Sequence, residues 1–423
     1  MRKFLALLFG VAALLLVGWY GYRTLVEQQV GFPLSALLEP ERKSSLPTEP
    51  DDWQGKIDYR NLDRDFAAMA ARPEMAGLAI AIVEDGEIRF VRTYGVTDKR
   101  SGEPVTPQTV FRWASVSKGV AGSLAAKLAT EGTLNLEAPL SGWQTSLRLP
   151  KSAEMRISLA QLLSHQTGLT KNSYDNKLED GESPSLLRGQ LSVAPLKCEP
   201  GTCHSYQNIA FDAVSEILGQ ATGTLYSGAV REQLFGPLGM SSAQFGRIGL
   251  TGAESWARPH RGDEVLTLSE SYWRVPAAAG VNSDIVDMAR WMRAQMGVDE
   301  AILSRETIAI AQAPLVRTGR VYGGDLARAL TTPSYGLGWR SFNYTGRQLV
   351  GHSGAVDGYR ATMIFDPAAR TGVVAMWNNG WGRPFTIPFA VLDSYYGQSV
   401  SDWLDLSEVP LPAPPTDVPA LSN

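Results

Sequence analysis

The stretch Leu78-Ala79-Ile80-Ala81-Ile82-Val83-Glu84-Asp85-Gly86-Glu87-Ile88-Arg89-Phe90-Val91 predicts a β-hairpin. Two apolar runs flank Asp85-Gly86, a dipeptide that favours the tight turn between antiparallel strands. Further strand-like runs, separated by turn residues, lie near the other end of the chain: Tyr335 to Asn343, Gln348 to His352, Tyr359 to Phe365 and Gly372 to Trp377. We therefore expect the hairpin to join strands from the opposite end of the sequence.

The sequence between these strands is mostly helical in its periodicity. An alanine-rich run extends from Ser115 to about Thr130, and further helical runs cover 209–218, 284–296 (with Ser283 as N-cap) and 388–396. This order predicts an α+β fold: an antiparallel sheet built from both chain ends, flanked by helices, with an inserted, mostly helical lobe at about 131–330. The active cleft is expected between sheet and lobe.

The first residues predict export. Arg2 and Lys3 precede an apolar run that continues from Phe4 to Tyr22 and would span roughly 28 Å as a helix. We favour an uncleaved anchor of residues 4–22 in the inner membrane, with the chain on the periplasmic side, because the basic residues precede the run. A cleaved signal segment is the alternative. We expect a linker at 23–55, one hydrolase domain at 56–400 and a proline-rich, disordered tail at 401–423.

The composition limits the partners. A net charge of −4 over 423 residues argues against nucleic acid, so we expect a small molecule or a peptide, whereas the oligomeric state is open. Cys198 and Cys203 flank the turn Pro200-Gly201, and export favours a disulfide between them over two free thiols. The four histidines are not at ligand spacing, so no metal or other cofactor is expected.

The run Ser115-Val116-Ser117-Lys118 is the candidate nucleophile and base. A serine hydroxyl needs a nearby base to remove its proton, and residues i and i+3 of a helix share one face. Burial and the positive field of a helix N-terminus both favour the neutral amine that a base requires. Taken alone, this four-residue pattern is weak, because many exposed helices carry it.

Two further triplets supply possible partners. In Tyr206-Gln207-Asn208, the tyrosine could shuttle a proton if nearby cations lower its pKa, and the Asn208 amide could hold Lys118 and the substrate. In His352-Ser353-Gly354, the glycine would let a substrate approach the strand edge. The Ala355 N–H could join that of Ser115 in an oxyanion hole.

These three sets resemble the motifs of the penicillin-recognising serine hydrolases, especially class C β-lactamases and their esterase and D-alanyl-D-alanine carboxypeptidase relatives. The resemblance covers about 77–398 and is strengthened by three blocks: Leu162-Leu163-Ser164-His165-Gln166-Thr167-Gly168-Leu169, Leu234-Phe235-Gly236-Pro237-Leu238-Gly239-Met240 and Gly351-His352-Ser353-Gly354-Ala355-Val356-Asp357-Gly358-Tyr359. It implies a covalent acyl-enzyme on Ser115, with Lys118 and Tyr206 handling protons and Asn172 contacting the acyl group.

One departure from the family pattern concerns the substrate. Histidine stands at position 352, where β-lactamases usually carry a lysine that holds the substrate carboxylate, and a neutral histidine would hold it less well unless a cation such as Arg360 helps. The leading hypothesis is hydrolysis of an amide, in a β-lactam or a D-amino-acid peptide. An esterase on the same scaffold and a non-catalytic penicillin-binding or sensor protein are the alternatives. A Ser-His-Asp hydrolase using Ser353 lacks the required strand-turn-helix context.

Overall fold

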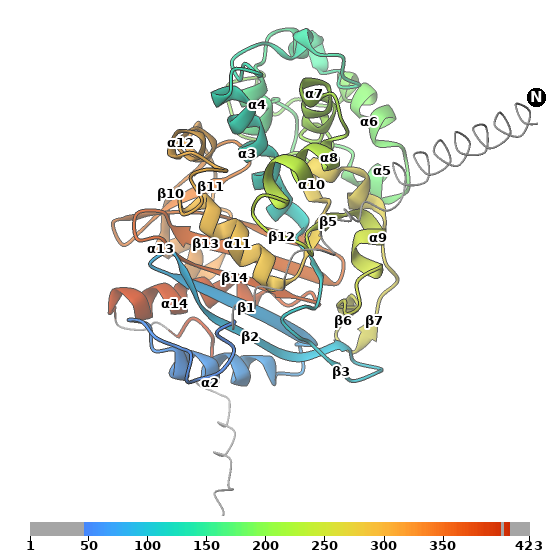
Figure 1. Cartoon of the computed structure of the whole chain (residues 1–423). Helices are drawn as coiled ribbons and strands as arrows, with labels where there is room; N and C mark the ends of the chain where they lie inside the picture. Colours follow the sequence, from blue (N-terminus) through green and yellow to red (C-terminus); the bar gives the residue numbers. More distant parts are fainter. Residues whose placement is uncertain (1–45, 399–401, 407–423) are drawn as a thin grey trace, which may run out of the picture. The chain divides into compact units, whose positions relative to one another are not determined.

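Residues 46–398 and 402–406 are described by the computed structural model, and they form an antiparallel sheet covered by helices (Figure 1). In the described residues the main sheet has nine strands in the order β3-β2-β1-β14-β13-β12-β11-β10-β9. Their bounds are β1 Gly77–Glu84, β2 Glu87–Asp98, β3 Glu103–Pro104, β9 Val316–Arg317, β10 Leu330–Tyr335, β11 Arg340–Tyr344, β12 Arg347–Val356, β13 Tyr359–Asp366 and β14 Thr371–Trp377.

The two ends of the chain meet in the middle of this sheet. Strand β1 pairs on one side with β2, as the hairpin prediction requires, and on the other side with β14, in a register that runs from Leu78 opposite Trp377 to Val83 opposite Gly372. The prediction of one antiparallel sheet assembled from both chain ends is therefore confirmed.

Each face of β1 packs against a different set of helices. Leu78, Ile80 and Ile82 belong to a core cluster with α2 (Tyr59–Ala70) and α14 (Ile387–Tyr396). Ala79, Ala81 and Val83 belong to a second cluster with α3 (Ser117–Thr130) and α11 (Ile285–Gln295). Side chains alternate between the faces of a strand, so a strand covered on both faces is expected to be apolar, as β1 is from Leu78 to Val83.

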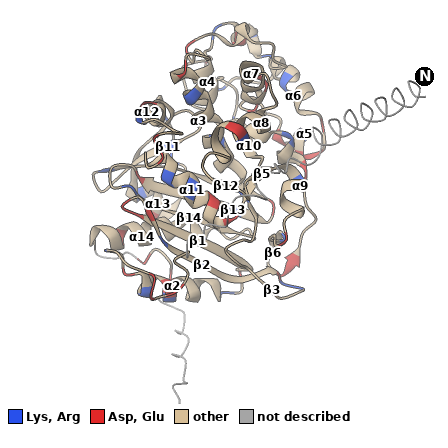
Figure 2. Ribbon diagram, in the orientation of Figure 1, with Lys and Arg blue, Asp and Glu red and all other residues tan. Residues whose placement is uncertain are grey.

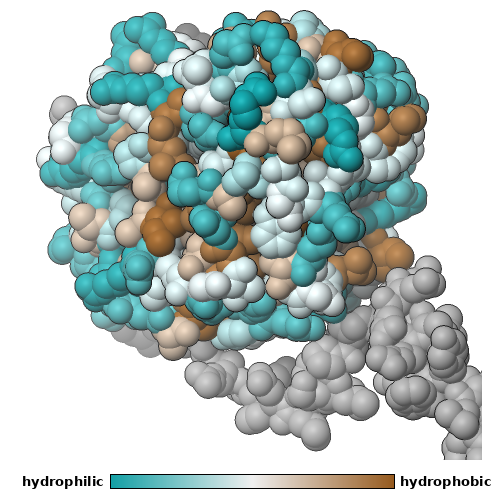
Figure 3. Space-filling view, turned by 90° about the horizontal axis from the view of Figure 1, so that it is seen from above, coloured by the Kyte–Doolittle hydropathy of each residue, from teal (hydrophilic) through white to brown (hydrophobic). Residues whose placement is uncertain are grey.

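A helical region lies above the sheet (Figure 1). The surface seen from above is mainly hydrophilic, with separate hydrophobic patches (Figure 3). The predicted lobe of 131–330 is too wide, because α11 and α13 lie within that range and pack on strands of the sheet. The helices in this part of the chain are α4 Leu159–Leu163, α5 Asp175–Glu179, α6 Pro184–Gln190, α7 Ala213–Thr222, α8 Tyr226–Val230, α9 Gly246–Thr251, α10 Pro276–Ala279, α12 Arg305–Gln312 and α13 Gly324–Ala329.

Three local predictions are wrong. The expected strand from Tyr335 to Asn343 is two strands, β10 and β11, because the turn between them packs on the backbone of α3. The cap of α11 is Asp284, whose carboxylate accepts from the backbone N–H of Asp287, and not Ser283. The helix expected from position 209 begins at Ala213.

The predicted linker and tail are each shorter than expected. Trp53 packs against Phe90 at a ring distance of 4.9 Å, so the chain already contacts the sheet before residue 56. Trp403 is buried and its Nε1 donates to Asp393, so the described residues after 401 are packed. The predicted anchor at 4–22 and the remainder of the linker and tail lie outside the described residues. None of the helices that the structure describes is long and apolar enough to cross a bilayer.

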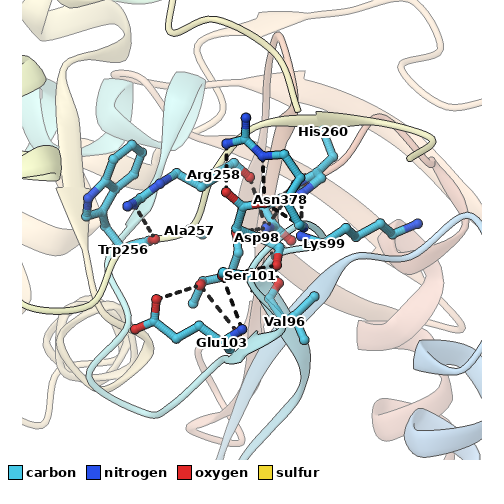
Figure 4. A network of polar contacts seen from close by, with 12 residues as sticks. Val96, Asp98, Lys99, Ser101, Glu103, Trp256, Ala257, Arg258, His260 and Asn378 are labelled. Carbon is cyan, nitrogen blue, oxygen red and sulfur yellow. Dashed lines mark hydrogen bonds and ion pairs between the residues drawn. The ribbon is translucent and has the colours of Figure 1, made fainter. Parts of the chain in front are cut away.

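A polar network fixes the end of β2 against the hairpin of β6 (His260–Arg261) and β7 (Glu264–Val265) (Figure 4). The Asn378 amide donates to the carbonyls of Thr97 at 3.0 Å and Arg258 at 2.9 Å. His260 accepts from the Lys99 N–H at Nε2, and its Nδ1 lies 3.1 Å from the Asn378 carbonyl. Both nitrogens of this histidine therefore serve the fold.

Candidate active site

A cavity of about 430 Å³ lies where the sheet meets the helical region, and all three predicted motifs line it. Ser115 is partly exposed there, as expected for a group that must reach a substrate. The motif residues that line the cavity are Ser115, Tyr206, Asn208, His352, Ser353, Gly354 and Ala355. Lys118 lies buried directly behind Ser115.

Ser115 is held on a short 3-10 turn, Ala114–Val116, between β4 (Phe111–Arg112) and α3. Ala114 has a φ of +47°, in the left-handed region that a residue with a Cβ rarely occupies. Such a conformation costs about 1–3 kcal/mol and persists only where the surroundings enforce it. Trp113 supplies part of that restraint, because it is buried and its Nε1 donates to Ser283 Oγ at 2.8 Å. The sequence contains no signal for this strained residue.

Two glycines let other parts of the backbone approach the nucleophile closely. At Gly338, which has a φ of +76°, a Cβ would lie 2.1 Å from the carbonyl oxygen of Lys118. At Gly354, on β12, a Cβ would lie 2.2 Å from the carbonyl oxygen of Trp113 and 3.0 Å from the Ser115 nitrogen. A side chain at either position would displace the main chain that carries Ser115 and Lys118.

The Lys118 amine contacts three oxygens. Its Nζ lies 2.7 Å from Asn208 Oδ1, 3.0 Å from the Ala278 carbonyl oxygen and 3.3 Å from Ser115 Oγ. The first two oxygens can only accept hydrogen bonds, and a neutral amine has two hydrogens and one lone pair. Donation to both carbonyls therefore directs the lone pair at the serine hydroxyl, as general-base catalysis requires.

Burial lowers the pKa of Lys118 to about 7 and is the largest influence on it. The Asp175 carboxylate opposes this effect, and the Arg340 guanidinium adds to it. Asp175 also fixes the Asn208 amide, because Asn208 Nδ2 donates to Asp175 Oδ2 at 2.7 Å and so turns Oδ1 toward Lys118. Near neutral pH much of the Lys118 population is therefore the neutral base.

Tyr206 lies beside the nucleophile as a neutral phenol. Its hydroxyl is hydrogen-bonded to Ser115, and its ring lies 4.7 Å from Lys118 Nζ. The condition that nearby cations lower its pKa is not met, because burial raises the pKa of Tyr206 to about 12 despite the opposing Arg340 guanidinium. Tyr206 is therefore suited to hand on a proton rather than to remove one.

His352 is held in a chain of hydrogen bonds at the floor of the cavity. The backbone N–H of Gln207 donates to His165 Nδ1 at 3.2 Å, and His165 Nε2 lies 3.2 Å from the Tyr335 hydroxyl. That hydroxyl lies 2.9 Å from His352 Nε2, while His352 Nδ1 lies 2.8 Å from the Ser353 carbonyl oxygen. The chain links the second and third predicted motifs through two buried residues, His165 and Tyr335.

The two ends of this chain set its direction. An N–H can only donate and a carbonyl can only accept, so His165 donates from Nε2, Tyr335 donates to His352 Nε2, and His352 donates from Nδ1. Burial lowers the pKa of both histidines well below the usual value, with the Arg340 guanidinium among the contributing charges. His352 is therefore neutral with both nitrogens occupied, and it offers no positive charge to a substrate.

Arg340 on β11 is a cation that sequence reasoning missed. It lines the cavity, and its guanidinium lies 5.4 Å from the centre of the Tyr206 ring and 5.0 Å from that of Tyr335. The proposed helper Arg360 is instead bound to the carbonyl oxygens of Val356 and Tyr359, and it is not among the described residues that line the cavity. An arginine inside the apolar run Leu337-Gly338-Trp339-Arg340 was the available signal.

The remaining predicted residues surround this centre. Asn172 is exposed at the cavity edge, where its backbone N–H donates to the Tyr206 carbonyl, and its φ of +54° is one that asparagine tolerates. The predicted disulfide between Cys198 and Cys203 is present and lies three residues before Tyr206. Ser353 lies within strand β12 and bonds to the hydroxyl of Tyr322 at 2.6 Å, so it is not on a strand-turn-helix elbow.

Known proteins share this architecture. The β-lactamase family model matches residues 62–385. The chain is 26% identical over 346 residues to a D-aminopeptidase of Gluconobacter oxydans, covering 75% of this chain and 58% of the relative. It is 29% identical over 259 residues to the D-alanyl-D-alanine-carboxypeptidase/endopeptidase AmpH of Escherichia coli, covering 60% of this chain and 64% of the relative. The matches thus span about three fifths of these relatives' length.

Two solved structures have a similar fold. The penicillin-binding protein homologue of Pyrococcus abyssi, described as octameric, aligns with a TM-score of 0.71 at 22% identity, covering 81% of this chain and 78% of that one. A class C β-lactamase mutant aligns with a TM-score of 0.66 at 20% identity, covering 81% and 99%. Because the family model covers most of the described residues, the chain belongs to the β-lactamase family.

Proposed function

We propose that this protein hydrolyses an amide bond through an acyl-enzyme on Ser115, in a D-amino-acid peptide or a β-lactam that carries a carboxylate beside the scissile bond. The observation that carries this proposal is the Lys118 amine, whose two carbonyl partners leave its lone pair facing Ser115 Oγ. The D-aminopeptidase and carboxypeptidase relatives support a peptide substrate.

The acylation step follows from these contacts. Ser115 Oγ attacks the substrate carbonyl carbon while its proton passes to Lys118 Nζ. The backbone N–H groups of Ser115 and Ala355 would stabilise the oxyanion. Tyr206 then gives its hydroxyl proton to the leaving nitrogen and takes up the proton held by Lys118 Nζ, and the C–N bond breaks. Water attacks the resulting ester in the reverse sequence and releases the acid and the free serine.

Arg340 supports the choice of a substrate with a carboxylate. Its guanidinium is buried at the cavity wall, and none of the described acidic side chains lies within ion-pair distance of it. A buried cation normally has an anionic partner, and a substrate carboxylate would supply one. His352 is neutral, so Arg340 takes the place of the third-motif lysine.

Intact-mass spectrometry tests the proposal. The protein is incubated with a penicillin, a cephalosporin, an activated ester and a D-alanyl-D-alanine peptide, and the mass of the acyl-enzyme and the hydrolysis products are followed. We expect acylation by a β-lactam and turnover of the peptide, both lost in Ser115→Ala and kept in the exposed-site control Ser192→Ala. Full activity of Ser115→Ala would overturn the proposal, and turnover of the ester alone would identify an esterase.

A stable adduct without any hydrolysis of amide or ester would instead identify a non-catalytic penicillin-binding or sensor protein. We also propose that the protein works outside the cytoplasm, tethered by residues 4–22. The disulfide Cys198–Cys203 supports this location, since such bonds persist in oxidising compartments. Fractionation of cells that express the full chain tests it, because a cytoplasmic product with free thiols would refute the location.

A further inference from the structure

Four basic residues line the cavity. Lys171 and Lys197 come from the helical region, Arg320 comes from the loop before α13, and Arg340 comes from strand β11. Asp175 is the one acidic residue among the described residues that line the cavity. Its carboxylate already accepts hydrogen bonds from Asn208 and Tyr272.

This excess of positive charge is local. The whole chain has a net charge of −4, and basic and acidic residues are interspersed along the elements of the structure (Figure 2). Several surface cations elsewhere have acidic neighbours, such as Asp85 beside Lys56 at 3.2 Å. In the part of the chain that the structure describes, no ion pair involves any of the four cavity cations.

Three of these cations act on the charge state of His204, which also lines the cavity. Lys197 Nζ donates to the His204 carbonyl oxygen at 3.0 Å. Burial lowers the pKa of His204 to about 3, and the charges of Arg340, Lys197 and Lys171 contribute in that order. A pocket wall with several like charges and no counter-ion creates a strong positive potential, which attracts anionic ligands and raises their local concentration.

The position of Tyr206 shows which part of the substrate faces this wall. In the proposed mechanism Tyr206 passes a proton to the leaving nitrogen, so the leaving group lies beside its hydroxyl. The Arg340 guanidinium lies 5.4 Å from the same ring. The His204 ring lies 5.3 Å from the ring of Tyr335, which lies 6.4 Å from that of Tyr206. The cationic wall is therefore on the leaving-group side of the scissile bond.

We infer that the leaving part of the substrate carries at least two acid groups, the first bound at Arg340 and the second at Lys171 and Lys197. The substrate class is a peptide that ends in an acidic D-amino acid, whose α-carboxylate and side-chain carboxylate are separated by a few bonds. This inference rests on the proposed function and specifies its substrate. The long lysine side chains can adjust to a second carboxylate without a rigid hydrogen-bonding geometry.

A pair of peptides that differ in one charge tests the inference. N-acetyl-D-alanyl-D-glutamate and N-acetyl-D-alanyl-D-glutamine have nearly equal shape, and kcat/KM for both is measured with the full chain. We expect about fivefold higher kcat/KM for the glutamate peptide at low salt, since an exposed ion pair contributes modestly. The ratio is expected to fall toward one at high ionic strength, where exposed charges are screened.

Variants assign the effect to the wall. In Lys171→Met/Lys197→Met the preference for glutamate is expected to disappear, because the roughly fivefold advantage of the glutamate peptide in kcat/KM is lost. Lys56→Met, remote from the cavity and paired with Asp85, is the matched control and should keep the preference. Circular dichroism of each variant checks that it is folded.

The outcomes separate this inference from the proposed function. Equal hydrolysis of the two peptides by the unmodified protein would overturn the second acid site and leave the acyl-enzyme mechanism standing. A preference that survives in the double variant would also overturn it. Absence of any Ser115-dependent amide hydrolysis, with these peptides and with β-lactams, would overturn the proposed function itself.

Discussion

Lys118 Nζ lies 4.7 Å from the centre of the Tyr206 ring and the Arg340 guanidinium lies 5.4 Å from it, but the two regions around these cations differ. Around Lys118 the protein supplies two carbonyl acceptors and excludes water, so the amine loses its charge near neutral pH. Around Arg340 it supplies aromatic rings and an open cavity. Lys118 is thus placed to act as a base, whereas Arg340 is placed to bind an anionic ligand.

Removal of the base is expected to give the largest effect. Lys118→Met keeps the apolar stem and deletes the amine, so kcat for acylation should fall by about 10³-fold or more, as expected for the loss of a general base. Stopped-flow measurement of acylation by a chromogenic β-lactam checks this value. Retention of more than a tenth of the rate would show that another group deprotonates Ser115.

Removal of the charge at Arg340 is expected to act on binding. Arg340→Met should lower kcat/KM by roughly 30-fold or more for a carboxylate-bearing substrate, chiefly through KM, because a buried charge pair is lost. An uncharged activated ester is the control, and its acylation rate should change by less than about threefold. An equal loss for both substrates would mean that Arg340 supports the structure of the site and does not distinguish substrates.

The pH profile measures how the two regions interact. Lys118 acts as a base when neutral, so the acylation rate should increase with pH through the pKa of about 7 and level off above it. The Asp175 carboxylate raises the pKa of Lys118, so Asp175→Asn should shift this rise to lower pH. Acylation rates of the unmodified protein and of Asp175→Asn, measured from pH 5 to 9, test the predicted shift. A shift to higher pH would contradict the assigned role of Asp175.

The smallest effect is expected from the disulfide. Cys198→Ser/Cys203→Ser opens a short loop, which should lower the free energy of unfolding by about 2 kcal/mol and the melting temperature by a few degrees. Because the loop leads into Tyr206, kcat should fall by about twofold to fivefold while KM for the activated ester changes little. Scanning calorimetry and steady-state kinetics test both values, and unchanged stability would show that the loop is restrained by its other contacts.

Much of the fold could be predicted from the sequence because its signals are local. The Asp85-Gly86 turn and the apolar runs specify the central hairpin. Ser115 and Lys118 are three positions apart, which places both on one turn of backbone. The split of the expected strand at Tyr335 could not be predicted, because it depends on contact between Gly338 and Lys118, which are far apart in the sequence.

The protonation states and charges of the site residues were harder to predict than which motif residues lie together. Tyr206 was expected beside cations, and it is, but its burial outweighs their effect on its pKa. Arg340 was missed in favour of Arg360. These arginines lie on β11 and β13, on either side of β12, and which of them faces the cavity depends on strand register and not on a motif. Desolvation and register are tertiary properties, and a single sequence gives little information about either.

The close approach at Gly338 and Gly354 has a consequence for how this active site tolerates sequence change. Main chain rests on main chain there, so the position of the backbone that carries Ser115 and Lys118 does not depend on the side chains of the outer cavity wall. Residues that line the cavity, such as Lys171, Lys197 and Arg320, can then be substituted under selection for new substrates without displacing this backbone. In a saturation mutagenesis screen, the two glycines should be nearly invariant, while these wall positions should accept many residues and change specificity.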